Sequence, residues 1–245
     1  MAGYHDNDYE LVNPQINTNA ANLSSIQTRT FGKMAVAMII SAVVALFMAM
    51  NGIQFGLAFA LIGLLAVVVL NMWLGAKIAT AKPSTCYLML GFESVYTGAL
   101  LGGTLQAYSP GAAFVAFLVT AVFFGGLVIS GWITRKDMTR VGSVCSTALI
   151  VLIIVEIIML FIGTPGIWML LSAVSIIIFA GLTLWDAQKL RGLTNDGSVL
   201  SENMSTFLAL ELYLDFVNLF MNILQSLLRE WALSLQGGGE SHTYN

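Results

Sequence analysis

The sequence predicts an all-α polytopic membrane protein with seven transmembrane helices, the last of which carries a polar stripe. Of its 245 residues, 58% are apolar and only 9% are Asp, Glu, Lys or Arg, whereas a soluble domain carries about 25% charge. Seven apolar runs each reach about 20 residues, which is enough to cross roughly 30 Å of hydrocarbon. The runs are unbroken, whereas the strands of a membrane barrel alternate over about ten residues.

The apolar runs begin at Met34 and follow one another closely. Their connections are short and hold glycine or proline, as in Asn51-Gly52 and Ser109-Pro110-Gly111, where freed backbone groups reach water. The seven expected helices cover residues 34–51, 53–75, 85–105, 111–134, 141–162, 167–190 and 204–228.

The two ends of the chain are polar. Residues 1–30 lack the basic start and immediate apolar run of a secretory signal, so we expect a flexible tail there. The membrane domain is expected over 31–230, and a short polar tail over 231–245. Both histidines, His5 and His242, fall in the tails, which disfavours every mechanism that needs a buried histidine.

The basic residues predict the orientation. The three loops on one side of the predicted bundle contain no Lys or Arg, whereas nine of the ten basic residues flank the helices on the other side. The positive-inside rule then places the N-terminus in the cytoplasm, and we expect the cytoplasmic membrane of a bacterium. The nine residues are Arg29, Lys33, Lys77, Lys82, Arg135, Lys136, Arg140, Lys189 and Arg191.

Small residues recur at a spacing of four in two of the expected helices. Gly98 with Gly102, and Gly126 with Ser130, have the spacing that lets helices approach closely in lipid. We expect this packing to lie within the chain rather than between two copies of it.

Five carboxylates lie inside the apolar runs, and no Lys or Arg lies deep enough to neutralise them. Inserting one charged Asp at a helix centre costs about 2.5–3.5 kcal/mol, so several together would approach a typical folding stability of 5–15 kcal/mol. Acids within the membrane therefore indicate a functional site. They are Glu93, Glu156, Asp186, Glu211 and Asp215.

The last helix gives the sharpest pattern. Glu211, Asp215, Asn218, Asn222 and Gln225 recur at steps of four, three, four and three, so they share one face. A polar face cannot meet lipid tails, and we expect this helix to be packed on all sides. The stripe favours a hydrated cation path, with a hydrogen-bonded seam that does not conduct as the alternative.

The other acids leave alternatives open. Asp186 either approaches Asp215 or pairs with Lys189 and Arg191 near the interface, and counting depth along straight helices leaves Asp215 about two turns too deep to meet it. Glu93 and Glu156 are each either an outer group that attracts ions or a protonated acid bonded to a neighbouring helix.

Two stretches, LWDAQKL at 184–190 and ELYLDFVNLF at 211–220, resemble the paired signature of the transmembrane Bax inhibitor motif family. The resemblance extends in helix number, order and loop length over about residues 30–230. It implies six helices that surround a central seventh, and a calcium leak regulated by pH. It also implies that Asp186 and Asp215 match the di-aspartyl sensor of the family.

Two carboxylates that meet in a low-dielectric site share a proton, so the sensor implies a leak that depends on pH along a bell-shaped curve. Members from bacteria carry a basic partner near the end of the second helix. This base would act as a latch by binding the ionised aspartates. Lys77 is the nearest candidate for the latch base and Lys82 the second, while Lys189 is a further candidate next to Asp186. The implied partners are protons, the lipid bilayer and calcium ions that bind transiently at Asp186 and Asp215.

Other classes fit less well. An intramembrane aspartyl protease also places one aspartate on each of two helices, but the Gly-x-Gly-Asp and Pro-Ala-Leu motifs of that class are missing. The cysteines form no disulfide or zinc pattern, phosphate loops and dinucleotide glycines are missing, and a net charge of −3 excludes a basic nucleic-acid surface. We therefore expect no enzyme and no cofactor. A proton-coupled transporter and a regulatory membrane protein that does not conduct remain alternatives.

Overall fold

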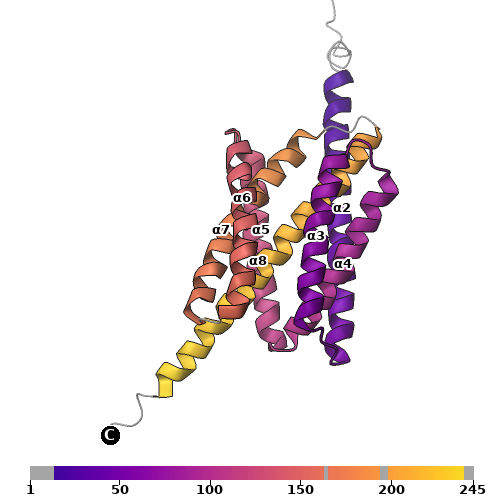
Figure 1. Cartoon of the computed structure of the whole chain (residues 1–245). Coiled ribbons are helices and arrows are strands. Elements are labelled where there is room, and N and C mark those ends of the chain that lie inside the picture. Colours follow the sequence, from indigo (N-terminus) through magenta and orange to yellow (C-terminus); the bar gives the residue numbers. More distant parts are fainter. Residues whose placement is uncertain (1–13, 163–164, 194–197, 240–245) are drawn as a thin grey trace, which may run out of the picture.

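The computed structural model describes residues 14–162, 165–193 and 198–239 (Figure 1). Within these ranges every regular element is a helix, and there are seven of them, which confirms the all-α class. They are α2 (Pro14–Met50), α3 (Leu57–Lys77), α4 (Pro83–Leu105), α5 (Pro110–Ile133), α6 (Thr139–Ile162), α7 (Pro165–Gly192) and α8 (Val199–Gly239).

Six of the described helices are long and apolar enough to cross a membrane, which identifies a multi-pass membrane protein. The exception is α4, although a seventh span was expected there. Its 23 residues include Glu93 and are interrupted by glycine, serine and threonine, which lowers its hydropathy. It packs against α2, α3 and α8, so many of its side chains contact protein.

The outer surface is apolar. Ile62 on α3, Val122 on α5 and Phe161 on α6 expose 69%, 77% and 76% of their surface, and many other large aliphatic and aromatic side chains do the same. A soluble monomer does not expose contiguous apolar surface on this scale. Lipid is therefore the solvent that this surface fits.

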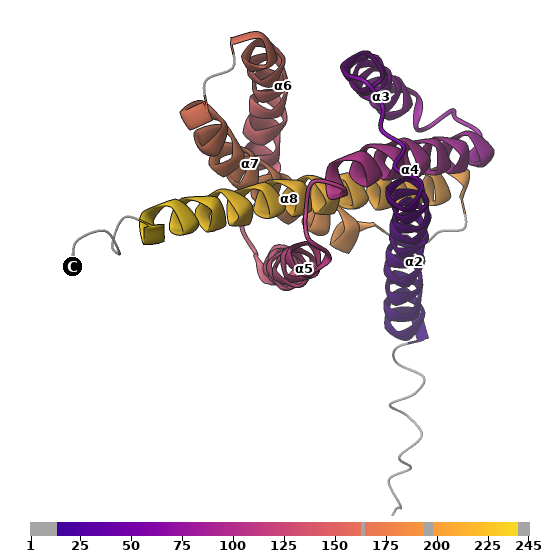
Figure 2. The ribbon, with the colours of Figure 1, turned by 90° about the horizontal axis from the view of Figure 1, so that it is seen from below.

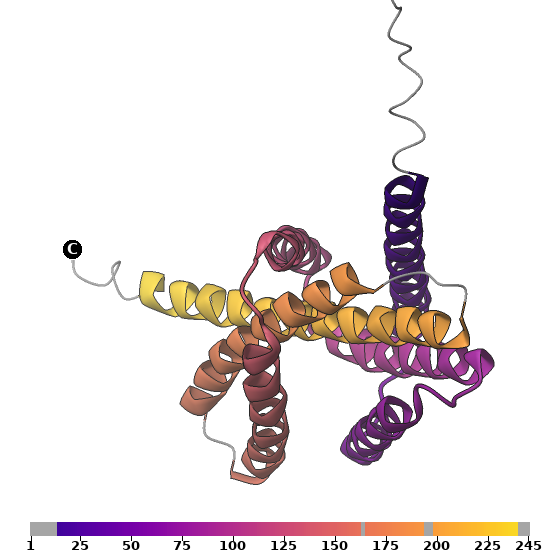
Figure 3. The ribbon, with the colours of Figure 1, turned by 90° about the horizontal axis from the view of Figure 1, so that it is seen from above.

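Two groups of helices flank α8, with α2, α3 and α4 on one side and α5, α6 and α7 on the other (Figures 2 and 3). α8 packs against α2, α4, α5 and α7, and Leu212, Tyr213, Leu219 and Leu224 along it are fully buried. Figure 1 shows that α8 runs obliquely, from beside α2 to beyond the far end of α7.

Local chemistry explains where the helices begin and end. Pro83, Pro110 and Pro165 each open a helix, because a first-turn residue needs no backbone donor and proline fixes the helical φ. α2 ends at Met50, and Gly52 caps it with a φ of +64°. The amide of the next residue, Ile53, donates to the carbonyl of Met48 at 3.0 Å. This arrangement is a Schellman cap, which requires the left-handed conformation that glycine adopts readily.

Both long helices extend beyond the predicted limits. α2 begins at Pro14, so residues 14–30, expected to belong to a flexible tail, are helical. Ile26 and Thr30 in this segment are buried. α8 begins at Val199 rather than at residue 204 and continues to Gly239.

Of the two pairs of small residues at a spacing of four, one packs closely against another helix and the other does not. A Cβ atom on Gly98 would lie 2.7 Å from the carbonyl oxygen of Ser41, and one on Gly102 would lie 2.5 Å from the Cβ of Met48. This pair therefore packs α4 against α2 within the chain, as expected. Gly126 has no atom within 4 Å of such a Cβ, so the expectation of close packing at that second pair was wrong.

Candidate ion and proton site

The C-terminal half of α7 presents one polar face to α8. Thr183, Asp186 and Lys189 follow at steps of three and therefore share this face. Thr183 is fully buried and Asp186 is 3% exposed, whereas Lys189 is half-buried. All three residues lie within the helix, because α7 continues without a break to Gly192.

Lys189 joins the two helices. Its Nζ lies 2.7 Å from Oδ1 of Asp186 on its own helix and donates at 2.7 Å to Oε2 of Glu211 on α8. The ammonium also lies 4.0 Å from the centroid of the Trp185 ring, a cation–π contact. One cation therefore holds a carboxylate from each helix.

Asp215 lies one helical turn beyond Glu211 and also faces α7. We call the cluster of Thr183, Asp186, Lys189, Glu211 and Asp215 the α7–α8 seam. Asp215 is 4% exposed, and its Oδ2 accepts a hydrogen bond from Thr183 Oγ1 at 3.1 Å. The carboxyl groups of Asp186 and Asp215 are close enough to interact with each other. The oblique course of α8 (Figure 1) supplies the physical reason: a tilted helix gains less depth per residue, so Asp215 is not too deep.

The seam contains more acid than base. Asp186, Glu211 and Asp215 would carry three negative charges against the single positive charge of Lys189, a net charge of −2 if all were ionised. Removing charges from water costs several kcal/mol per ion unless they are paired. The site must therefore take up protons or cations.

The predicted stripe continues along α8 with weaker polarity. Asn222 Nδ2 donates to Ser175 Oγ on α7 at 2.9 Å, whereas Asn218 Nδ2 donates to the carbonyl of Leu214 on its own helix. Asn218, Asn222 and Gln225 are all half-buried. Three of the five stripe residues, Glu211, Asp215 and Asn222, therefore bond directly to α7.

Two of the three predicted latch bases lie elsewhere. Lys77 and Lys82 are exposed at the connection between α3 and α4 and form no ion pair with any described residue. That connection is held by Asn203, whose Nδ2 donates to two of its carbonyls at 3.0 and 2.8 Å. Asn203 precedes Asp215 by twelve residues, or about 18 Å along α8. Among the bases of the described residues, Lys189 alone forms ion pairs with the acids of the seam.

Other polar residues at the end of α7 hold the neighbouring connection. Gln188 Nε2 donates to the carbonyl of Lys136 at 2.8 Å, and its Oε1 accepts from the Met138 amide at 2.9 Å. Arg191 donates to the carbonyls of Trp132 and Thr134 at the end of α5. Arg191 is therefore engaged with α5 and not with Asp186.

Glu93 and Glu156 have different surroundings. Glu93 on α4 is fully buried, and its Oε1 accepts a hydrogen bond from Asn71 Nδ2 on α3 at 2.7 Å. Glu156 on α6 is half-buried. Neither forms an ion pair with a described residue.

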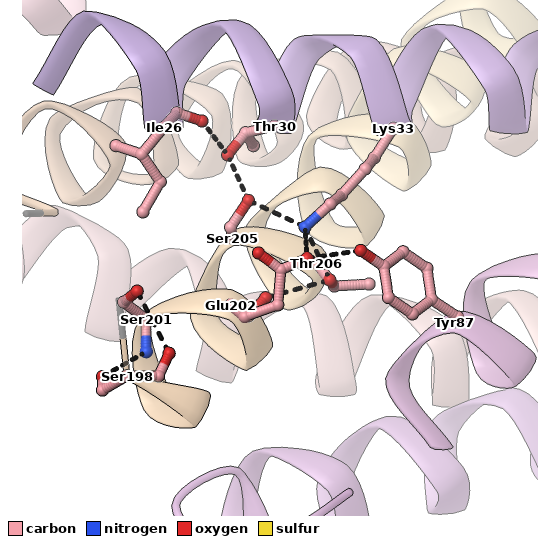
Figure 4. Close-up of polar contacts among 9 residues, drawn as sticks. All are labelled: Ile26, Thr30, Lys33, Tyr87, Ser198, Ser201, Glu202, Ser205 and Thr206. Carbon is pink, nitrogen blue, oxygen red and sulfur yellow. Dashed lines mark hydrogen bonds and ion pairs between the residues drawn. The ribbon is translucent and has the colours of Figure 1, made fainter. Parts of the chain in front are cut away.

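A further polar cluster fixes the start of α8, and we call it the α8 clamp (Figure 4). Lys33 Nζ on α2 donates to Glu202 Oε1 at 2.7 Å, to Thr206 Oγ1 at 2.9 Å and to Ser205 Oγ at 3.1 Å. Tyr87 on α4 donates its hydroxyl to the same carboxylate of Glu202. One base and one acid are therefore matched here, about 20 Å along α8 from Asp215.

Sequence reasoning missed the neutral partners of the acids. Thr183 and Ser175 on α7 bond to Asp215 and Asn222, and the sequence analysis assigned neither a role. Their spacing carried a signal, because Ser175 and Thr183 precede Asp186 by eleven and three residues, close to three turns and one turn of helix. Both therefore fall near the face that holds Asp186.

The described residues contain no group of three or more His, Cys, Asp or Glu side chains that is arranged to hold a metal ion. Calcium takes six to eight oxygen ligands. The seam supplies a few carboxylate oxygens and one hydroxyl, so a calcium ion there would keep much of its water.

The sequence matches a known family. The model of that family, described as inhibitor of apoptosis-promoting Bax1, matches residues 23–230, which include the whole α7–α8 seam. The chain belongs to this family. The match confirms the resemblance carried by LWDAQKL and ELYLDFVNLF.

Several bacterial proteins are similar over most of their length. An uncharacterised protein of Deinococcus radiodurans is 33% identical over 221 residues, covering 84% of this chain and 93% of its own. One of Borreliella burgdorferi is 31% identical over 220 residues, covering 81% and 89%. The inner membrane protein YbhL of Escherichia coli is 29% identical over 215 residues, covering 84% and 92%.

The shared cation leads to a prediction about stability. Replacing Lys189 by methionine keeps most of the stem and removes the ammonium, so Asp186 and Glu211 must take up protons to stay buried. We expect the variant to lose about 3 kcal/mol of unfolding free energy at neutral pH, as when a buried pair is broken. The folded variant then binds more protons than its unfolded chain, so the loss shrinks as the pH falls.

Thermal unfolding in detergent at about pH 5 and about pH 8 measures this effect. Lys77→Met is the matched control, because Lys77 is exposed and has no ion pair with a described residue. A loss of equal size at both pH values would show that Lys189 does not compensate buried charge.

Proposed function

We propose that the protein is a pH-sensitive leak channel for calcium or similar cations, and not an enzyme. The observation that carries the proposal is the seam in which Lys189 binds Asp186 and Glu211, with Asp215 beside them. It combines buried acids in excess over bases with a contact between two helices. Such a site attracts cations and responds to protons, and the family membership is consistent with this role.

The proposed gate is the bridge made by Lys189. When the acids are ionised, the ammonium attracts carboxylates on both helices and holds α7 against α8. Protonating one acid removes one of these attractions, which favours separation of the helices. Protonating all of them also removes the negative charge that draws a cation in, so the leak is greatest at an intermediate pH.

The proposed path follows the half-buried stripe of Glu211, Asp215, Asn218, Asn222 and Gln225 on α8. Carboxylates supply charge and amide oxygens supply the hard ligands that calcium prefers. In the full proposal all seven helices cross the membrane and six of them surround α8. The packing of α8 against α2, α4, α5 and α7 supports a central position for this helix.

The proposed orientation has the N-terminus in the cytoplasm. A single cysteine at Asp137, in the α5–α6 connection, should then be protected from an impermeant thiol reagent in intact cells, whereas one at Ser109 should react. Cys86 and Cys145 would first be replaced. Reversed labelling would overturn the orientation derived from the basic residues.

Calcium flux tests the path directly. Asp215→Asn keeps the volume of the side chain and removes its charge, so we expect calcium uptake into proteoliposomes to fall at least about tenfold, the effect of 1.4 kcal/mol. Asp137→Asn is the control, because this exposed carboxylate lies outside the membrane. Normal calcium flux in Asp215→Asn would place the path elsewhere, and proton flux without calcium flux would favour a proton-coupled transporter.

The dependence on pH tests the gate. The wild type should show a bell-shaped leak between about pH 5 and about pH 8, and Asp186→Asn should lose that shape because the shared proton site is broken. Hydrogen bonds from the Thr139 hydroxyl and amide hold the pKa of Asp137 below its ordinary value. Asp137→Asn should therefore leave the curve unchanged. An unaltered curve in Asp186→Asn would exclude this acid as the sensor.

A further inference from the structure

A second buried acid lies on the other side of α8. Glu93 is 0% exposed. Its Oε1 accepts one hydrogen bond, from Asn71 on α3 at 2.7 Å, and its Oε2 has no hydrogen-bond partner among the described residues. A carboxylate that is both buried and incompletely bonded is unusual, because buried polar groups are normally satisfied.

No base in the described part of the chain pairs with this acid. The ion pairs among the described residues involve Lys33 and Lys189, and none includes Glu93. The neighbouring helices offer neutral groups: Asn71 comes from α3, and the hydroxyl of Tyr213 on α8 lies 2.6 Å from that of Ser41 on α2. Tyr213 is a titratable group within the electrostatic reach of Glu93.

A charged carboxylate in these surroundings would be neither hydrated nor paired, and such groups take up a proton instead. We propose that Glu93 is a second proton-binding site, separate from the α7–α8 seam and occupied at neutral pH. Asn71 positions the acid, because its amide donates to the oxygen that stays a carbonyl when the other oxygen carries the proton.

The site adjoins α8 on the side away from Asp186. Tyr213 and Asp215 are two residues apart, so they point to roughly opposite sides of the helix. Asp215 faces α7, whereas Tyr213 faces α2 and α4 and lies within the electrostatic reach of Glu93. The same helix therefore contacts one proton site on each side, and loss of the Glu93 proton would place a charge at the contact of α3, α4 and α8.

Infrared spectroscopy tests the proton itself. The protein is purified in a maltoside detergent, which has no carbonyl group, and the spectrum of Glu93→Gln is subtracted from that of the wild type at neutral pH. We expect the difference to contain the carbonyl band of a neutral carboxylic acid, which shifts in heavy water. The acids of the α7–α8 seam cancel in this difference.

Glu202→Gln is the matched control, because Glu202 is paired with Lys33 at 2.7 Å and should contribute a carboxylate band instead. If Glu93→Gln fails to fold, Asn71→Leu replaces it: losing the amide donor should move the acid band to higher frequency. A carboxylate band from Glu93 would overturn the proposal, and so would an acid band whose frequency is the same in Asn71→Leu as in the wild type. Neither result depends on whether the protein conducts calcium.

The proposal also fixes the sign of a stability effect. If the folded protein holds a proton on Glu93 and the unfolded chain releases it, the free energy of unfolding falls as the pH rises. Glu93→Gln needs no proton, so its unfolding temperature should exceed that of the wild type by a margin that grows from about pH 5 to about pH 8. A margin that is constant, or that grows toward acid pH, would contradict a proton on Glu93.

Discussion

The ammonium of Lys189 is the interaction on which the α7–α8 seam depends. Among the described residues it is the one base that pairs with Asp186 and Glu211, and its two contacts of 2.7 Å join a carboxylate of α7 to one of α8. Without it, the acids of that seam would have only neutral partners such as Thr183. The oblique course of α8 (Figure 1) is consistent with the contact between its acids and α7, because a tilted helix gains less depth per residue.

The sequence predicted the helices better than their contacts. Unbroken apolar runs determine the number of helices, and the spacing of Glu211 and Asp215 determines the polar face of α8. The tilt of α8 depends on long-range packing, so depth counted along straight helices misplaced Asp215 relative to Asp186. The family resemblance pointed to Lys77 at the end of the second helix as the basic partner, whereas the side chain that reaches Asp186 is Lys189, one turn away on the same helix.

The α8 clamp and the α7–α8 seam lie on the same helix and differ in their balance of acids and bases. In the clamp, the carboxylate of Glu202 forms an ion pair with Lys33 and accepts a hydrogen bond from Tyr87 (Figure 4). Its negative charge is therefore compensated by one positive charge. In the seam, Lys189 faces several acids, and proton uptake changes the number of ionic contacts between α7 and α8.

Buried acids weaken a membrane protein unless something compensates them, and this chain compensates its acids in three ways. Among the described residues, Glu202 has its own base, the acids of the seam share Lys189, and Glu93 has only the amide of Asn71 as a hydrogen-bond partner. The fewer bases an acid meets, the more its charge depends on protons instead. Sensitivity to pH should therefore be least at the clamp and greatest on the two sides of α8, where a change of charge acts directly on helix packing.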